Sequence, residues 1–414
     1  TGSSRQIQKQ PPQQTIADGL DQTLEYLMDP ISGSKAHNKN VEGIVTIHVD
    51  DAFMTGTPFF IKHVIDRLRT DFKVGSEDTD DIMFVGQRCR WLDKGKPSSR
   101  IVVDQERKVE ELSECQLDKN MSDTLACTPE LHRQFRSVLG QINWLQSRTQ
   151  YQSCYLFSRC ASACAKPTIG DMRSLNKLVR KIRHEKVDLI FWPLKGPCRL
   201  VGYPDAAYRN NEDKTSQRGQ VIFICEARKN GQVNTRGSLV DYESQNIKRT
   251  VLSTTVSALY AFTKCFGTCQ FLRGLWMDMS ASQAPIHMRT DANNLVSTAS
   301  TTHLPEQKET IHMINQLRME ACSGSIHDLA HVISVDCLAD CLTKASANPC
   351  YLIKAVNTGW LPNVDKHPPF RELMKNRHNA YFMAWIARHI DNPWIVHEFF
   401  GEDVHASLMA YLDS

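Results

Sequence analysis

Hydrophobic residues first follow a regular pattern in the stretch IVTIHVDDAFMTG, residues 44–56. Four apolar β-branched residues precede the pair Asp50–Asp51 and favour a strand, and three apolar residues follow the pair. The stretch therefore predicts two short strands joined by a tight turn. The aspartates themselves have two readings. They are an ordinary polar hairpin turn, or two carboxylates placed to hold a metal ion.

The next segment continues with helix-like and strand-like patterns. Apolar residues recur every three or four positions over residues 60–72, which predicts an amphipathic helix. Short apolar runs at 82–85 and 101–103 predict strands. We expect residues 41–115 to form a small α+β unit.

Residues 129–190 carry the spacing of three helices, which begin near Pro129, span 154–165 and cover about 175–182. The third helix is rich in basic residues, namely Arg173, Lys177, Arg180, Lys181, Arg183 and Lys186. A solvated helix face explains them, and so does a face that follows a phosphate backbone.

After a linker at 193–197 the pattern changes to strands and helices in alternation. The expected elements are strands at 199–204, 220–225 and 237–242, a helix at 251–273, a strand at 285–290, helices at 291–300 and 308–320, a strand at 325–333 and a helix at 336–345. Three hairpin-like strands followed by alternating elements predict a mixed sheet covered by helices, so the fold class is α+β or α/β.

The chain thus divides into five predicted parts. They are a flexible lead-in (1–40), the α+β unit (41–115), a helical segment (116–195), the mixed-sheet domain (196–346) and a C-terminal helical extension (347–414).

Composition narrows the class of protein only a little. The 414 residues are 41% hydrophobic with a net charge of +3, so any nucleic-acid surface would have to be local. No apolar run is long enough for a membrane span, and the polar N-terminus has no signal core. We therefore expect a cytoplasmic or nuclear protein, without a membrane partner, whose 14 cysteines are reduced. Cys265/Cys269 and Cys337/Cys341 share the spacing of a helix face, but without CxxC pairs they indicate zinc only weakly.

Three aspartates occupy matching places in the mixed-sheet domain. Asp205 and Asp291 each come just past a predicted strand, and Asp340 lies on the first turns of the last predicted helix. Each one alone is a plausible turn or capping residue. Together they would meet at one sheet edge, where clustered carboxylates stay ionised only around a divalent cation. The set predicts a Mg²⁺ (or Mn²⁺) site.

Seven collinear strings resemble the Pol polyprotein of Copia-type LTR retrotransposons. In the sheet domain LVGYPDAAY, VLSTTVSALYAF, MRTDANNLV and CLADCLTK resemble that family's ribonuclease H strings. Upstream, IHVDDAFMTG, DIMFVGQRCRW and FRSVLGQINWLQSRTQ resemble the "YVDD" hairpin, the next strand and the helical segment of its reverse transcriptase. The resemblance implies a partial reverse-transcriptase palm, a thumb or connection segment and an RNase H-like domain. The implied partners are an RNA–DNA hybrid or other nucleic acid and other polyprotein segments.

The same resemblance implies which residues carry ribonuclease chemistry. The family uses an Asp–Glu–Asp–Asp set that holds two Mg²⁺ ions, and Asp205, Asp291 and Asp340 match three of its members. The glutamate position falls on Ala258, which can neither bind metal nor orient water. Glu243 is near in sequence but lies outside the aligned helix. We expect weak or no RNase H activity, and the alternative reading is a non-catalytic nucleic-acid-binding remnant.

The polymerase resemblance is less complete. Asp50 and Asp51 match the family's metal-binding pair, while His48 replaces its usual tyrosine. The family needs a third aspartate on an earlier palm strand. Before the hairpin, Asp18 and Asp21 lie in a segment that does not read as a core strand. We expect this chain not to extend a primer.

One motif points to a different chemistry. HDLAH, residues 327–331, resembles the HExxH motif of zinc proteases, which requires a helix and a glutamate. The apolar residues around it alternate as in a strand, which would separate the two histidines. We therefore expect a strand here and no protease site.

Overall fold

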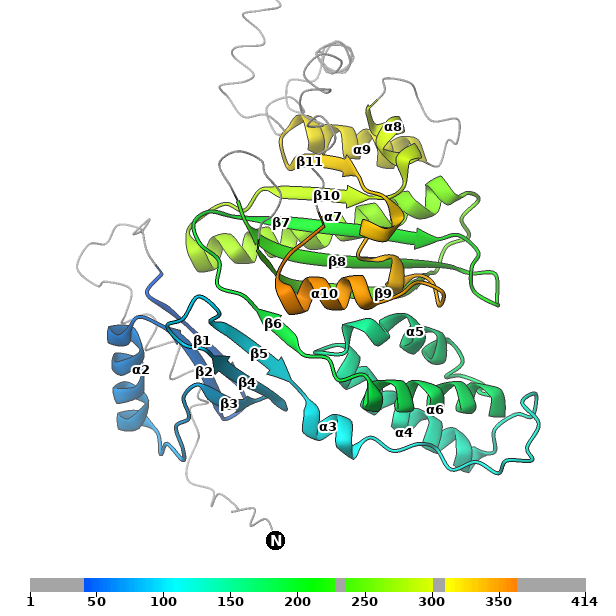
Figure 1. Ribbon diagram of the computed structural model, residues 1–414, viewed down its shortest axis with the longest axis horizontal. Coiled ribbons are helices and arrows are strands. Elements are labelled where there is room, and N and C mark those ends of the chain that lie inside the picture. Colours follow the sequence, from blue (N-terminus) through cyan, green and yellow to red (C-terminus); the bar gives the residue numbers. More distant parts are fainter. Residues whose placement is uncertain (1–40, 228–235, 301–309, 363–414) are drawn as a thin grey trace, which may run out of the picture.

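The computed structural model describes residues 41–227, 236–300 and 310–362. The predicted lead-in, 1–40, and residues 363–414 of the predicted extension lie outside these ranges. The described strands form a two-stranded, a four-stranded and a five-stranded sheet (Figure 1). Within the described ranges, no helix is both long and apolar enough to cross a bilayer.

The predicted hairpin is present and is followed by the predicted helix. Strands β1 (Gly43–His48) and β2 (Asp51–Gly56) pair antiparallel. His48 pairs with Asp51, so Val49 and Asp50 form the turn. Helix α2 (Pro58–Asp71) follows, and the side chain of Thr57 caps it by accepting a hydrogen bond from the Phe60 N–H.

The four-stranded sheet contains two strands that the sequence analysis missed. It consists of β3 (Asp81–Phe84), β4 (Gln87–Leu92), β5 (Arg100–Asp104) and β6 (Leu189–Phe191), all antiparallel. Val85 and Gly86 both have positive φ and turn β3 back into β4, so one predicted strand becomes a hairpin. β6 has only three residues and returns to this sheet after the helical segment.

The helical segment matches its predicted periodicity. Helices α4 (Pro129–Gln146), α5 (Cys154–Ser162) and α6 (Ile169–His184) follow the short α3 (Glu106–Glu111). Buried apolar residues of α4, α5 and α6 pack together in one core. Thr168 and Asp171 form a capping box at the start of α6.

The predicted mixed five-stranded sheet with flanking helices is confirmed. Its strands are β7 (Cys198–Ala207), β8 (Ser216–Glu226), β9 (Gly237–Ile247), β10 (Ile286–Thr290) and β11 (Ile326–His331), in the order β11-β10-β7-β8-β9. The first three strands are antiparallel neighbours, and β7, β10 and β11 run parallel. β10 and β11 end at paired residues, Thr290 and His331, while β7 continues beyond its ladder with β10 to Ala207 (Figure 1).

Helices cover both faces of this sheet (Figure 1). On one face lie α7 (Thr254–Ser280), α8 (Asn293–Ser300) and α9 (Ile311–Cys322), which pack on apolar residues of β7, β8 and β10. A Cβ at Gly202 of β7 would lie 3.0 Å from the sulfur atoms of Cys265 and Cys269. Glycine therefore lets α7 approach the sheet closely, and these two cysteines are packing residues.

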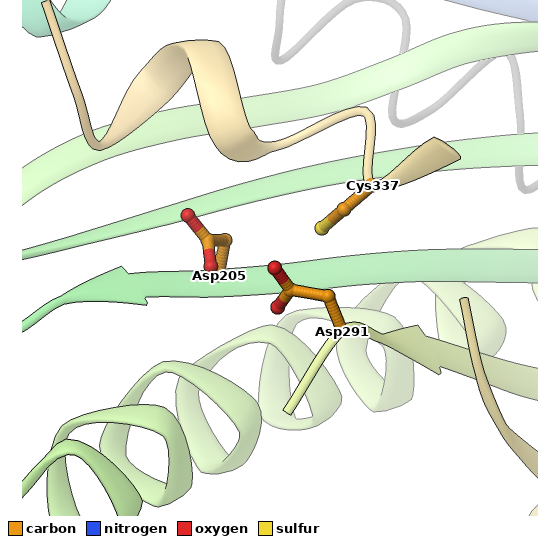
Figure 2. A group of neighbouring side chains, drawn as sticks. All are labelled: Asp205, Asp291 and Cys337. Atoms are coloured by element: carbon orange, nitrogen blue, oxygen red, sulfur yellow. The ribbon is translucent and has the colours of Figure 1, made fainter. Parts of the chain in front are cut away.

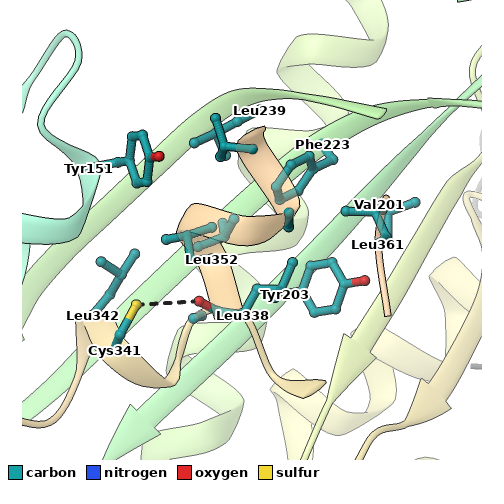
Figure 3. Close-up of a cluster of buried hydrophobic side chains, with 14 of the residues drawn as sticks. Tyr151, Val201, Tyr203, Phe223, Leu239, Leu338, Cys341, Leu342, Leu352 and Leu361 are labelled. Atoms are coloured by element: carbon teal, nitrogen blue, oxygen red, sulfur yellow. Dashed lines mark hydrogen bonds between the residues drawn. The ribbon is translucent and has the colours of Figure 1, made fainter. Parts of the chain in front are cut away.

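The other face packs against α10 (Cys350–Thr358) and the chain before it. Figure 3 shows Tyr203 and Phe223 of the sheet among Leu338, Leu342 and Leu352. This core also takes in residues from the helical segment and the four-stranded sheet, namely Val103, Tyr151, Cys154, Val187 and Leu189. The sheet domain therefore shares its core with the earlier parts of the chain.

The helix predicted at 336–345 is wrong. The chain there makes two 3₁₀ turns, Ser334–Asp336 and Asp340–Leu342, with an extended residue, Cys337, after the first. Residues 337–343 are buried except for the half-buried Asp340. A segment buried on nearly all sides has no solvated face, so tertiary packing decides its conformation.

Candidate metal centre

Strand register brings Asp205 and Asp291 to the same level of the sheet. Gly202 of β7 pairs in parallel with Met288 of β10. Asp205 lies three residues after Gly202, and Asp291 lies three residues after Met288. The ladder between the two strands ends at Gly202, and Pro204 has no N–H to extend it. Asp205 lies within β7, which continues to Ala207 along β8, rather than just past the strand as predicted.

The two aspartates form a potential ligand group with a cysteine. Ligand atoms of Asp205, Asp291 and Cys337 all lie within 4.8 Å of one another, and their side chains point toward one another in Figure 2. Burial raises the pKa of the Cys337 thiol well above its usual value, so the sulfur stays protonated. In the metal-free chain the neutral Cys337 thiol therefore lines the group, and the two carboxylates are its charged members.

Asp205 is a buried carboxylate with a small set of partners. Only 5% of the residue is exposed. Burial raises its pKa to about 6, the positive charge of Lys344 opposes this rise, and the negative charge of Asp291 adds to it. The Thr343 hydroxyl donates a hydrogen bond to Oδ2 of Asp205. Because this carboxylate has little solvent to stabilise its charge, it is suited to bind a cation.

Gly219 allows the segment that carries Thr343 to reach the sheet. It pairs with Asp205 across the β7–β8 ladder. A Cβ at this position would lie 2.9 Å from both Leu342 Cβ and Thr343 Cγ2. The absence of a side chain therefore lets the second 3₁₀ turn pack directly over the strand beside Asp205.

Asp340 approaches this group through a lysine. The ammonium group of Lys344 contacts Oδ1 of Asp340 and lies 3.9 Å from Oδ2 of Asp205. Burial would lower the pKa of Lys344, but Asp205 and Asp340 outweigh it and raise the pKa. Asp340 is half-buried and is not part of the group formed with Asp291 and Cys337.

The residues present fit one divalent cation. Carboxylate oxygens are preferred ligands of Mg²⁺ and suit Mn²⁺ as well, and Mg²⁺ keeps several waters rather than requiring a full protein cage. Asp205 and Asp291 supply two such carboxylates, and Asp291 is further held by Ser334 Oγ, which donates to its Oδ2 at 3.2 Å.

Among the described residues, no carboxylate takes the place of the glutamate that the resemblance implies at position 258. Ala258 lies near the start of α7 and is half-buried. Glu243 is on β9, which β8 separates from β7, and forms an ion pair with Arg218 at 2.8 Å. Glu243 therefore serves the β8–β9 ladder, and the carboxylate group around Asp205 does not include it.

Asp50 and Asp51 lie on a different sheet and are exposed. Val49, the turn residue before them, has a φ of 59°, which is unusual for a β-branched residue. Within the described ranges, the carboxylate–cysteine group at Asp205 is the one set of three or more potential metal ligands, so no third ligand meets the hairpin pair there.

The HDLAH segment forms strand β11, as predicted. Asp328 accepts a hydrogen bond from Arg289 Nη2 at 2.6 Å and lies 3.6 Å from Nδ1 of His287. The rings of His287 and His327 are 5.0 Å apart. These residues hold β10 and β11 together, which gives the motif a structural role.

The basic face of α6 is partly neutralised. Of the six basic residues predicted for this helix, Lys186 lies just beyond its end, and four pair with acidic residues: Arg173 with Asp123, Arg180 with Glu114, Lys181 with Glu185 and Lys186 with Glu106. These pairs favour the reading of a solvated face over that of a phosphate-binding face.

Sequence reasoning missed the place of three residues in the centre: Cys337 was noted only with Cys341 as a weak indication of zinc, and Thr343 and Lys344 were not singled out. All three belong to the string CLADCLTK, of which only Asp340 was singled out as a site residue. The available signal was the position of two polar residues, Thr343 and Lys344, directly after an apolar run. The structure shows that Thr343 is fully buried, and a buried hydroxyl needs a hydrogen-bond partner.

Comparison with known proteins gives low-identity structural similarities. No family model and no curated protein matches the chain. RNase H1 of Halobacterium salinarum aligns at 16% identity and a TM-score of 0.25, covering 35% of this chain and 94% of that one. The N-terminal RNase H domain of a Mycobacterium tuberculosis protein aligns at 13% identity and a TM-score of 0.25. The alignment covers 39% of this chain and 95% of that one.

A foamy viral protease–reverse transcriptase in complex with an RNA/DNA hybrid aligns at 15% identity and a TM-score of 0.39. The alignment covers 78% of this chain and 38% of the viral chain. These proteins are what the chain is similar to.

Proposed function

We propose that the chain is a fragment of a Copia-type retrotransposon Pol protein whose sheet domain binds RNA–DNA hybrids and cleaves their RNA strand weakly or not at all. The observation that carries this proposal is the convergence of Asp205 and Asp291 at the ends of adjacent parallel strands. A buried carboxylate beside a second one is the arrangement that a divalent cation stabilises. The seven collinear strings supply the identity of the nucleic acid.

The residues divide the work of such a site among them. Asp205 and Asp291 would hold a Mg²⁺ or Mn²⁺ ion, which when bound polarises a phosphate oxygen and lowers the pKa of water. Thr343 fixes the orientation of the Asp205 carboxylate by its hydrogen bond. Ala258 has no group that could hold a further ion or orient water, so positioning of the attacking water is weakened.

The second candidate is a nucleic-acid-binding remnant without catalysis. Ala258 at the glutamate position favours it, because the loss of one carboxylate impairs cleavage more than it impairs backbone binding. The paired basic residues of α6 limit the surface available for such binding. Both candidates share hybrid binding, and cleavage separates them.

The test uses the full chain and a fluorescent RNA–DNA hybrid. We expect anisotropy to report binding that weakens as salt rises, with little or no RNA cleavage in Mg²⁺ or Mn²⁺. The variant Ala258→Glu should gain cleavage, and Ala258→Gln, of the same size without charge, should not. Adding Asp205→Asn to Ala258→Glu should abolish the gain.

Two results would overturn parts of the proposal. Hybrid binding no stronger than that of a control protein of similar net charge would remove the nucleic-acid function. Sustained cleavage by the unaltered chain, lost in Asp205→Asn, would show that the site works without the glutamate.

A further inference from the structure

The Lys344 side chain is partly buried, and its ammonium group lies close to two carboxylates. Its side chain is 34% exposed, while those of its partners Asp340 and Asp205 are 23% and 4% exposed. The ammonium group contacts Asp340 Oδ1 and is 3.9 Å from Asp205 Oδ2. Asp291 and Cys337 approach Asp205 as a separate group that does not include Asp340. Asp205 therefore has charged neighbours on two sides. Asp291 approaches it on one side, and Lys344 with its partner Asp340 approaches it on the other.

The local charges balance with a single divalent ion. Three carboxylates, Asp205, Asp291 and Asp340, face one ammonium group. One divalent cation makes this set neutral, and a second would leave it with excess positive charge. Two metal ions in paired sites lie about 3.5–4 Å apart and repel each other, and an ammonium group that already contacts Asp340 near Asp205 disfavours a second ion there.

We propose that the ammonium group of Lys344 takes the place of a second cation between Asp205 and Asp340, so that the site holds one divalent ion. This inference rests on the proposed function, because it concerns how many ions that metal centre binds. Lys344 is a positioning residue in this scheme. It fixes Asp340 and the outer side of Asp205, and leaves the face toward Asp291 for the ion.

The test counts Mn²⁺ ions bound by the metal-stripped full chain near neutral pH, using the electron paramagnetic resonance signal of free Mn²⁺. Ions bound elsewhere are subtracted with the triple variant Asp205→Asn/Asp291→Asn/Asp340→Asn. We expect one ion for the unaltered chain and two for Lys344→Met. Lys344→Arg should keep one ion, because the charge is retained. Lys354→Met changes an exposed lysine of α10 and should also keep one.

Circular dichroism checks the fold of each variant, and Lys344→Gln replaces Lys344→Met if the latter unfolds. Two ions in the unaltered chain, or one ion in the neutral variants at position 344, would overturn the role of Lys344 while leaving the metal centre intact. No ion above the triple variant would overturn the metal centre itself. The count of ions, rather than activity, therefore separates the two failures.

Discussion

The Thr343 hydroxyl donates a hydrogen bond to Oδ2 of Asp205, which is 138 residues away in the chain. Both residues are buried, Thr343 completely and Asp205 to all but 5% of its surface. The bond joins the last segment of the sheet domain to its first strand. It also gives a hydroxyl partner to a carboxylate that is costly to bury.

Replacement of Thr343 by valine should destabilise the chain by about 1–3 kcal/mol, because it leaves the buried Asp205 carboxylate without its hydroxyl partner. Urea-induced unfolding near neutral pH measures the change. Thr70→Val is the control, since the Thr70 hydroxyl donates to the Asp66 carbonyl on exposed α2. Equal losses in the two variants would show that the bond to Asp205 has no special weight.

Replacement of Gly219 by alanine should destabilise the chain by about 1–3 kcal/mol, because the new methyl group would overlap Leu342 and Thr343 at 2.9 Å. Thermal unfolding measures the effect. Gly267→Ala is the matched control, since this glycine lies exposed in α7 with nothing within 4 Å of an added Cβ. There alanine should be neutral or stabilise by up to about 1 kcal/mol. A tolerated Gly219→Ala would contradict the close approach of the second 3₁₀ turn.

Stability should fall as pH drops from about 6.5 to 4 because of His287. Burial lowers its pKa to about 4, and Arg289 and Arg199 add to the shift while Asp328 opposes it. Below pH 6.5 the histidine binds a proton in the unfolded chain but not in the folded chain. The unfolding free energy that is present above that pH is therefore lost as the pH falls toward 4. The neighbouring ring of His327 also faces this group.

His287→Gln should therefore lose about 2 kcal/mol less unfolding free energy between pH 7 and pH 5 than the unaltered chain. Asp205, with its raised pKa, titrates in the same window with the opposite sign, and the comparison with the variant cancels its contribution. His184→Gln, on the exposed side of α6, is the control. Identical pH profiles for His287→Gln and the unaltered chain would contradict the buried neutral histidine.

The chain should not extend a primer on an RNA template. Asp50 and Asp51 are exposed on the β1–β2 turn, and no third ligand joins them within the described ranges. Incorporation of labelled nucleotide in Mg²⁺ or Mn²⁺ measures the activity. Extension by the unaltered chain that disappears in Asp51→Asn would show that the hairpin is a working polymerase site.

Local patterns predicted the elements with a regular repeat, namely the helical segment with its 3.6-residue period and the strands of the five-stranded sheet. Asp205 and Asp291 meet because each lies three residues beyond the last parallel pair between β7 and β10. β6 was missed because three residues give too short a pattern, and its partner β5 lies far away in sequence. The turn at Val85–Gly86 was missed because valine gives no signal for positive φ.

The errors at the site have a similar cause. Asp340 was placed on a helix because the spacing of CLADCLTK suits one, but the segment is buried on nearly all sides and its conformation is decided by packing. The contacts of Thr343 and Lys344 with Asp205 depend on how β7 meets that segment. Such long-range contacts leave no periodic trace in the chain.

The core shared between the five-stranded sheet and the earlier chain also governs how the protein can be divided for study. Tyr203 and Phe223 pack in one cluster with Tyr151 and Leu189, which precede the linker at 193–197. A fragment beginning at that linker would expose the part of this core that Tyr151 and Leu189 cover and would be prone to aggregate. The behaviour of a truncated chain would then reflect its exposed core residues. In the full chain the sheet that carries Asp205 keeps this core covered.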